Sequence, residues 1–281
     1  MKDLKQILAV GSIAYDSLDT PKGNRERILG GSCTYFSVAA SHYAKTSIIG
    51  VVGNDFDNKS WSLFKEYNID TECVEIADGP TFSWGGKYNS DYSQRDTLFT
   101  NLGVFEHFKP KINTNLKNPI LYLGNIQPSL QLDVIKKVKN PAIIAADSMN
   151  LWIDLFPKQV WELISKVNIF MLNDEEARQL TGETNLEKIS EKFLSLGPKI
   201  VIIKMGGKGS LLAFKDKKHY VSVVPNTEVY DPTGAGDSFA GGVIGYIAKY
   251  GLDNPIEAVS YTHLRAHETR EDLVCRRLRE K

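Results

Sequence analysis

The sequence predicts an α/β fold with a mostly parallel central sheet flanked by helices. Six short runs rich in β-branched and other apolar residues recur along the chain, and most are continuous rather than alternating, as expected for strands covered on both faces. The chain has 281 residues, 42% of them hydrophobic and 24% charged, which is typical of a globular protein with a substantial core. The expected strands are Ile7–Ile13, Ser47–Val52, Ile120–Leu123, Ala142–Ala146, Ile169–Leu172 and Ile200–Ile203.

Segments with helical spacing lie between these strands. Residues 130–138 and 160–167 each place apolar side chains three or four positions apart, which predicts one buried helical face. An alternation of strand, helix and strand implies right-handed crossovers and therefore parallel strand pairs.

Two stretches interrupt the alternation. Residues 14–30 leave the first strand without helical periodicity, and residues 73–100 carry short apolar runs among Gly, Asn, Asp and Ser. The second stretch predicts short antiparallel strands, the first of them at Val74–Ile76. We expect the two stretches to pair as a small β-sheet that forms a lid over an active site. A pair of unrelated surface loops remains the alternative.

Charge and composition exclude several classes of protein. Lys and Arg total 34 and so do Asp and Glu, so no net charge favours nucleic acid or anionic lipid. The three cysteines, Cys33, Cys73 and Cys275, form no CxxC motif, which argues against a disulfide framework or a thiolate zinc site. No signal peptide or membrane-spanning run is recognisable, so we expect a cytoplasmic protein.

The most informative segment is residues 229–242, VYDPTGAGDSFAGG. An expected strand at Tyr220–Val224 precedes it and an apolar helical run follows, so Gly234, Ala235 and Gly236 should lie at a helix N-terminus. Unpaired backbone N–H groups and the helix dipole attract anions there. Asp237 follows directly, and the same dipole should lower the pKa of its carboxylate and keep it ionised. Asp237 could then accept a proton from a hydroxyl, or it could simply cap the helix.

This segment resembles the C-terminal signature of the PfkB (ribokinase-like) carbohydrate kinase family. The other family landmarks follow in order over about residues 5–260, which implies a ribokinase-like domain over residues 1–260. Asp16 and Gly30-Gly31 stand where such kinases hold the hydroxyls of a sugar or nucleoside. By itself, Asp16 could accept two vicinal hydroxyls or be a plain loop carboxylate, and the two glycines could form a ligand-binding turn or an ordinary one.

Two further landmarks resemble the nucleotide side of the family site. Asn173 and Glu176 match its NxxE motif, which implies Mg²⁺ held indirectly through water, although Glu176 could equally cap the following helix. The loop from Lys204 to Gly209 resembles the GxxG nucleotide loop but could be a hairpin turn. The nucleotide-binding set is Asn173, Lys204, Gly206, Gly207, Gly209 and Thr233. Asp147 and nearby Asn150 are weaker candidates for substrate or phosphate contact at the same sheet edge.

The resemblance implies transfer of the γ-phosphoryl group of ATP to a sugar or nucleoside hydroxyl. Asp237 would act as base, and the amides of Gly234, Ala235 and Gly236 would form the anion hole. Mg²⁺ is the expected cofactor, and K⁺ is a candidate because family members often bind a monovalent cation there. A catalytically silent binding protein of the same fold is the alternative. An oxidoreductase lacks its G-x-G-x-x-G fingerprint, and residues 53–60 imitate a P-loop without its second glycine.

The chain departs from the family pattern at two places. Tyr35 stands where many sugar kinases of the family carry asparagine, which favours a nucleoside or an unusual sugar as acceptor. After Ser260 the match ends, and residues 261–281 resemble translated adaptor DNA, so we expect a foreign tail and about thirty to fifty missing native residues. His263 and His267 in that tail share a helical spacing but have no third metal ligand in view. Because lid strands of this family often pair between subunits, a homodimer through residues 73–100 is also expected.

Overall fold

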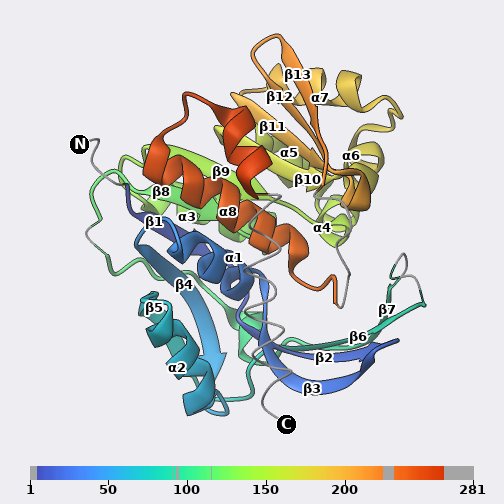
Figure 1. Ribbon diagram of the computed structural model, residues 1–281. Coiled ribbons are helices and arrows are strands. Elements are labelled where there is room, and N and C mark those ends of the chain that lie inside the picture. Colours follow the sequence, from blue (N-terminus) through green and yellow to red (C-terminus); the bar gives the residue numbers. More distant parts are fainter. Residues whose placement is uncertain (1–4, 91, 93–94, 115, 224–230, 263–281) are drawn as a thin grey trace.

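The main body of the protein is a nine-stranded sheet with helices on both faces (Figure 1). The computed structural model describes residues 5–90, 92, 95–114, 116–223 and 231–262. The strand order is β13-β12-β11-β10-β9-β8-β1-β4-β5; all pairs from β11 to β5 are parallel, and β12 and β13 are antiparallel additions. The bounds are β1 Ile7–Val10, β4 Thr46–Gly53, β5 Asp70–Ala77, β8 Ile120–Leu123, β9 Ile143–Asp147, β10 Ile169–Asn173, β11 Ile200–Lys204, β12 Ser210–Phe214 and β13 Lys217–Val221.

Side chains alternate between two apolar clusters, one on each face of this sheet. In β1, Ile7 and Ala9 belong to one cluster and Leu8 and Val10 to the other, as the two-residue period of a strand requires. The first cluster is covered by α1 (Ser32–Ser41), α2 (Asn58–Glu66) and α8 (Ala235–Tyr250). The second is covered by α3 (Pro128–Lys137), α4 (Asn150–Leu155), α5 (Pro157–Ile164), α6 (Asp174–Thr181), α7 (Leu186–Leu194) and a 3₁₀ segment at Gly103–His107. The predicted α/β class is confirmed.

A second, four-stranded sheet is built from the two predicted excursions. Its order is β3 (Gly23–Gly30), β2 (Ala14–Thr20), β6 (Ser83–Tyr88) and β7 (Arg95–Asn101). The alternative of two unrelated loops is therefore wrong. Figure 1 shows this sheet projecting from the body beside α1 and β4.

Two details of the small sheet differ from expectation. Val74–Ile76 lies in β5 of the large sheet, because this segment completes a regular crossover from β4 through α2. As an edge strand, β5 is only partly buried, and its mixed polar and apolar sequence therefore resembled that of a lid strand. Moreover, β2 and β6 pair in parallel, whereas the β2–β3 and β6–β7 pairs are antiparallel.

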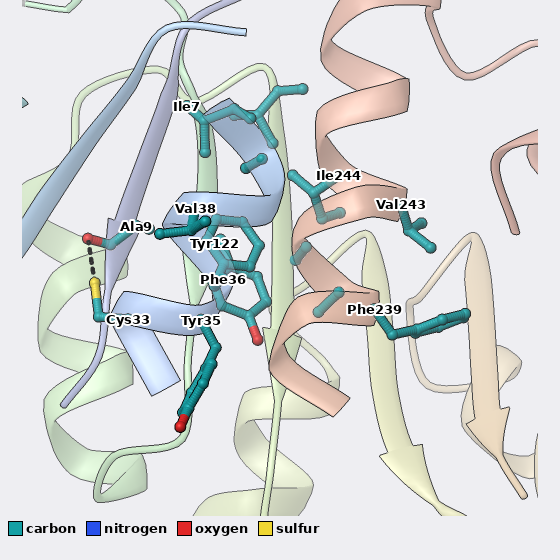
Figure 2. Packing of buried hydrophobic residues seen from close by; sticks show 14 of the residues in the cluster. Ile7, Ala9, Cys33, Tyr35, Phe36, Val38, Tyr122, Phe239, Val243 and Ile244 are labelled. Carbon is teal, nitrogen blue, oxygen red and sulfur yellow. Dashed lines mark hydrogen bonds between the residues drawn. The ribbon is translucent and has the colours of Figure 1, made fainter. Parts of the chain in front are cut away.

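Helices α1 and α8 lie side by side and bring their N-terminal ends together. Figure 2 shows Phe36 of α1 stacked on Tyr122 of β8, with Ile244 on the side of α8 that faces them; the two ring centroids are 3.6 Å apart. A Cβ at Gly241 of α8 would lie 2.3 Å from the carbonyl oxygen of Phe36, so glycine permits this close contact. The start of α8 is thereby fixed next to the start of α1.

The C-terminal part of the chain differs from the expected boundaries. Of the strand expected at Tyr220–Val224, the structure places residues up to Val221 in β13, and residue 224 lies outside the described residues. Helical structure continues from 255 to 262, across the predicted boundary at 260. Most of the predicted foreign tail, with His263, His267 and Cys275, lies outside the described residues. Within the described part of the chain, no helix is long and apolar enough to cross a membrane.

Candidate active site

The candidate site lies where three parallel strands end. Asp147, Asn173 and Lys204 are the last residues of the adjacent strands β9, β10 and β11. Ligands bind at this carboxyl edge in open α/β sheets. The start of α8 faces the same edge, since the position of a Cβ on Gly236 lies 3.2 Å from Lys204 Nζ. The fold therefore brings together groups that are far apart in the sequence.

A buried ion pair forms the centre of this site. Lys204 Nζ lies 2.5 Å from Asp147 Oδ2, and the two side chains are 18% and 4% exposed. Burial by itself would lower the pKa of Lys204, but the negative charges of Asp147 and Glu176 outweigh it and raise that pKa. Lys204 is thus a permanent cation among carboxylates, and Asp147, predicted to contact substrate, is paired with Lys204.

Asp237 is in the first turn of α8, but its electrostatics differ from the prediction. Burial and the negative charge of Asp147 raise the pKa of Asp237 from its ordinary value of 3.8 to about 7, although the Lys204 charge opposes them. The expected lowering by the helix N-terminus is therefore wrong. Loss of solvation and nearby carboxylates outweigh the partial charge of the helix end. A carboxyl group with a pKa near neutrality is well suited to accept a proton and release it again.

The glycine-rich turn before Asp237 has the geometry of an N-terminal anion site, with one restriction. Gly234 caps α8 in a left-handed conformation, with φ at 71°, which glycine adopts without strain. The N–H of Ala235 donates to the carbonyl of Pro232 at 3.1 Å, so one of the three predicted amides is already engaged. Within the described chain, the N–H groups of Gly234 and Gly236 have no such bond to a backbone carbonyl. Among the described residues, these two amides are therefore the ones of the predicted set without a backbone acceptor.

The predicted acceptor side lies next to this turn. Asp16 in β2 is 4% exposed, and a Cβ at Gly30 would lie 1.9 Å from its carboxylate, so glycine makes room for it. Tyr35 donates a hydrogen bond to Asp16 Oδ2 at 3.5 Å, and its ring lies against Gly234. Figure 2 shows the Tyr35 hydroxyl directed away from the apolar cluster. Because Tyr35 is 6% exposed, it forms a wall between Asp16 and the turn rather than an open stacking face.

Asn173 and Glu176 form a reciprocal capping box at the start of α6. The N–H of Glu176 donates to Asn173 Oδ1 at 2.8 Å, and the N–H of Asn173 donates to Glu176 Oε2 at 2.9 Å. The capping role considered for Glu176 is therefore real. Burial raises the pKa of Glu176 to about 7, and the charge of Asp147 adds to this effect. The capping box also holds Glu176 Oε2 at the carboxyl end of β10, next to Asn173.

The predicted nucleotide loop is a short 3₁₀ turn at Gly206–Lys208, between the antiparallel strands β11 and β12. Gly206 and Gly207 are exposed, and a Cβ on either would meet nothing within 4 Å. The loop is thus a hairpin turn, as the plainer interpretation held, and its open outer face leaves room for a ligand. Thr233 and Asn150 also lie near the site. The N–H of Thr233 donates a hydrogen bond to Asp231 Oδ1, and the backbone of Asn150 donates one to the carboxylate of Glu176.

Sequence reasoning missed two tyrosines of this region. Tyr88 at the end of β6 contacts Thr233, with 2.8 Å between the two hydroxyl oxygens. Tyr122 is fully buried, and within the described residues its hydroxyl has no hydrogen-bond partner, although the charges of Asp147 and Asp237 act on it. Neither tyrosine belongs to a motif, so no local signal could have identified them.

Comparisons with known proteins show the family of this chain. The pfkB family carbohydrate kinase profile matches residues 5–260. A cytidine kinase from Thermococcus kodakarensis is 26% identical over 258 residues, which cover 89% of this chain and 90% of that protein.

Two solved structures share the fold. A nucleoside kinase from Burkholderia thailandensis in complex with inosine superposes with a TM-score of 0.79 at 19% identity, covering 93% of this chain and 89% of that one. A protein from E. coli described as a ribokinase II, in complex with ATP and Mg²⁺, gives 0.77 at 20% identity, with coverages of 94% and 92%. With the family profile spanning nearly all described residues, this chain belongs to the pfkB family of carbohydrate kinases and is a small-molecule kinase.

Proposed function

We propose that the protein transfers the γ-phosphoryl group of ATP to a hydroxyl group of a nucleoside or a related sugar. The observation that carries this proposal is the position of Asp237, which directly follows the anion-binding turn and lies within electrostatic reach of Asp16. A base beside a phosphate site on one side and a hydroxyl-binding carboxylate on the other is the arrangement that phosphoryl transfer requires.

In this mechanism Asp16 accepts the hydroxyl groups of the acceptor and thereby orients it. The ionised carboxylate of Asp237 then takes the proton of the attacking hydroxyl. The amides of Gly234 and Gly236 hold the oxygens of the moving phosphoryl group, and one such donor is commonly worth about 3 kcal/mol in the transition state. Lys204 adds a fixed positive charge next to Gly236.

The oxygen donors at the strand edge suit Mg²⁺. Glu176 and Asn173 supply carboxylate and amide oxygens, the donor chemistry that Mg²⁺ prefers, and would hold the ion through water. Among the described residues, no group of three His, Cys, Asp or Glu side chains could ligate a metal directly, which fits an ion held mostly by water and phosphates. Mg²⁺ bound there would neutralise charge on the phosphates of ATP. K⁺ beside the anion turn is part of the same proposal.

A nucleoside acceptor is favoured over a free sugar. The cytidine kinase and the inosine-bound nucleoside kinase described above act on or bind nucleosides, and this is what supports the preference. Thermal unfolding with a panel of ligands tests this point. Nucleosides should raise the melting temperature more than ribose or hexoses, and the reverse ranking would reject a nucleoside acceptor.

The test of the activity itself is ADP release with Mg²⁺–ATP and the best acceptor of that panel. The Asp237→Asn variant should lose nearly all turnover while still binding the acceptor. Unchanged turnover in this variant would reject Asp237 as base. Binding of acceptor without ADP release by the unaltered chain would favour the catalytically silent alternative.

The small sheet is proposed to act as a lid and to pair with a second copy of this chain. Its outer strand β7 is exposed along its whole length, and Leu98 and Phe99 on it are 57% and 38% exposed. Such an edge strand can add a strand from a symmetry-related copy. Light scattering should give a dimer mass for the unaltered chain and a monomer mass for Leu98→Asp. A monomer mass for the unaltered chain would reject this assembly.

A further inference from the structure

A hydrogen bond joins the small sheet to the turn that precedes α8. The hydroxyl of Tyr88, the last residue of β6, lies 2.8 Å from the hydroxyl of Thr233, 145 positions further along the chain. Tyr88 is 7% exposed, and its ring lies against that of Tyr92 with 5.9 Å between centroids. Burial raises the pKa of Tyr88, so its hydroxyl keeps its proton and can donate it.

Thr233 is held from several sides. Its N–H donates to Asp231 Oδ1 at 2.8 Å, and Asp231 is itself 6% exposed. The next residue, Gly234, has the ring of Tyr35 against it and caps α8. The turn is therefore fixed between a tyrosine of α1 and a tyrosine of the small sheet, directly beside the amides proposed to bind an anion.

The surroundings of Tyr88 favour one direction of its hydrogen bond. Arg95 is the cross-strand partner of Tyr88 in the β6–β7 pair, and its guanidinium interacts with the Tyr88 oxygen by charge and hydrogen bond. A guanidinium can only donate, so the Tyr88 oxygen accepts from Arg95, and Tyr88 keeps its own proton available for Thr233. Either hydroxyl can be the donor in the Tyr88–Thr233 bond. When Tyr88 is the donor, the hydroxyl proton of Thr233 can point at an anion. Successive hydrogen bonds of this kind polarise and strengthen one another.

We propose that Tyr88 is a positioning residue that, through its hydroxyl, makes Thr233 an additional hydrogen-bond donor to the phosphoryl group bound at Gly234 and Gly236. The inference rests on the proposed function and deepens it. The small sheet contributes to phosphate binding at the start of α8, and not only to acceptor binding.

Phosphate binding can be measured without an acceptor. Inorganic phosphate is titrated into the full chain, and the melting temperature is recorded for the unaltered protein, Tyr88→Phe and Tyr92→Phe. The Tyr92 variant loses the same atom from the neighbouring ring and serves as the matched control. Tyr88→Phe should need about tenfold more phosphate for the same stabilisation, because Thr233 then loses the partner that holds its hydroxyl as a donor to the charged group. The control should match the unaltered protein, and equal titrations for all three chains would overturn the inference.

Variants at Thr233 separate positioning from a general packing effect. Thr233→Val should weaken phosphate binding at least as much as Tyr88→Phe, whereas Thr233→Ser keeps the hydroxyl and should restore most of it. Because Tyr88 is proposed to act through Thr233, the double variant Tyr88→Phe/Thr233→Val should be no weaker than Thr233→Val alone. Additive losses in the double variant would show that Tyr88 acts elsewhere and would overturn the inference.

The outcomes also separate this inference from the proposed function. Phosphate-dependent stabilisation that needs the Tyr88 hydroxyl, combined with no ADP release for any acceptor, supports the inference and rejects the kinase mechanism. ADP release that is abolished in Asp237→Asn, combined with identical phosphate titrations for Tyr88→Phe and the unaltered chain, keeps the kinase mechanism and overturns the inference. Absence of any stabilisation by phosphate in the unaltered chain overturns the inference as well.

Discussion

Replacing Asp237 by asparagine should stabilise the folded protein at alkaline pH while removing its activity. The folded state raises the pKa of this carboxyl group from 3.8 to about 7, because burial and the charge of Asp147 disfavour the ionised form. Asparagine has nearly the same shape and carries no charge at any pH. The variant therefore avoids the free-energy cost of holding a carboxylate in this place.

The magnitude and the sign follow from linkage. A pKa difference between 3.8 and about 7, at about 1.36 kcal/mol per pH unit, gives an upper limit of about 4 kcal/mol. Part of the Asp237 side chain remains accessible to solvent, so we expect roughly half of this, about 2 kcal/mol. Between pH 3.8 and 7 the folded state binds more protons than the unfolded state, so the stability of the unaltered protein falls as pH rises through this window.

Urea or thermal unfolding of both proteins from pH 4 to pH 9 checks the prediction. At pH 8 Asp237→Asn should be more stable by about 2 kcal/mol, which corresponds to roughly 4–8 °C in melting temperature for a chain of this size. At pH 4 the two proteins should have nearly equal stability. A variant that is less stable at pH 8, or a difference that does not shrink on acidification, would refute the reasoning.

Three further predictions concern neighbouring groups. Lys204→Met leaves the buried Asp147 carboxylate unpaired, so it should lower the free energy of unfolding by about 3–5 kcal/mol. Because the Lys204 charge lowers the pKa of Asp237, its loss should also move the midpoint of the pH–rate profile, set by Asp237, upwards, and an unmoved midpoint in steady-state kinetics would contradict this. Tyr122→Phe removes a buried hydroxyl with no partner among the described residues, so unliganded stability in urea should stay equal or rise by about 1 kcal/mol, and a clear loss would show a hidden partner. Gly30→Ala places a methyl group against the Asp16 carboxylate, so KM for the acceptor should rise about tenfold or more while KM for ATP stays unchanged. Equal effects on both KM values would argue against a role of Asp16 confined to acceptor binding.

The sequence by itself determined the architecture and the edge of the sheet at which the candidate site residues lie. Strand runs such as Ile120–Leu123 and Ile200–Ile203 were predicted within one residue of β8 and β11, because continuous apolar runs reflect burial on both faces. Parallel strands place their carboxyl ends together, so the neighbourhood of Asp147, Asn173 and Lys204 followed from their positions at strand ends. The motif around Asp237 could carry the family resemblance because its glycines and its carboxylate residue are adjacent in the sequence.

Only the tertiary structure decided the electrostatics and the long-range contacts. The pKa of Asp237 depends on how completely other elements exclude water and on Asp147 from a distant strand, whereas the sequence showed only the local helix end. The Tyr88–Thr233 hydrogen bond joins the end of β6 to the turn before α8, two segments that share no motif. The place of β5 in the large sheet was equally hidden, because most residues of this edge strand are only partly buried and it therefore lacks the continuous apolar pattern by which central strands are recognised.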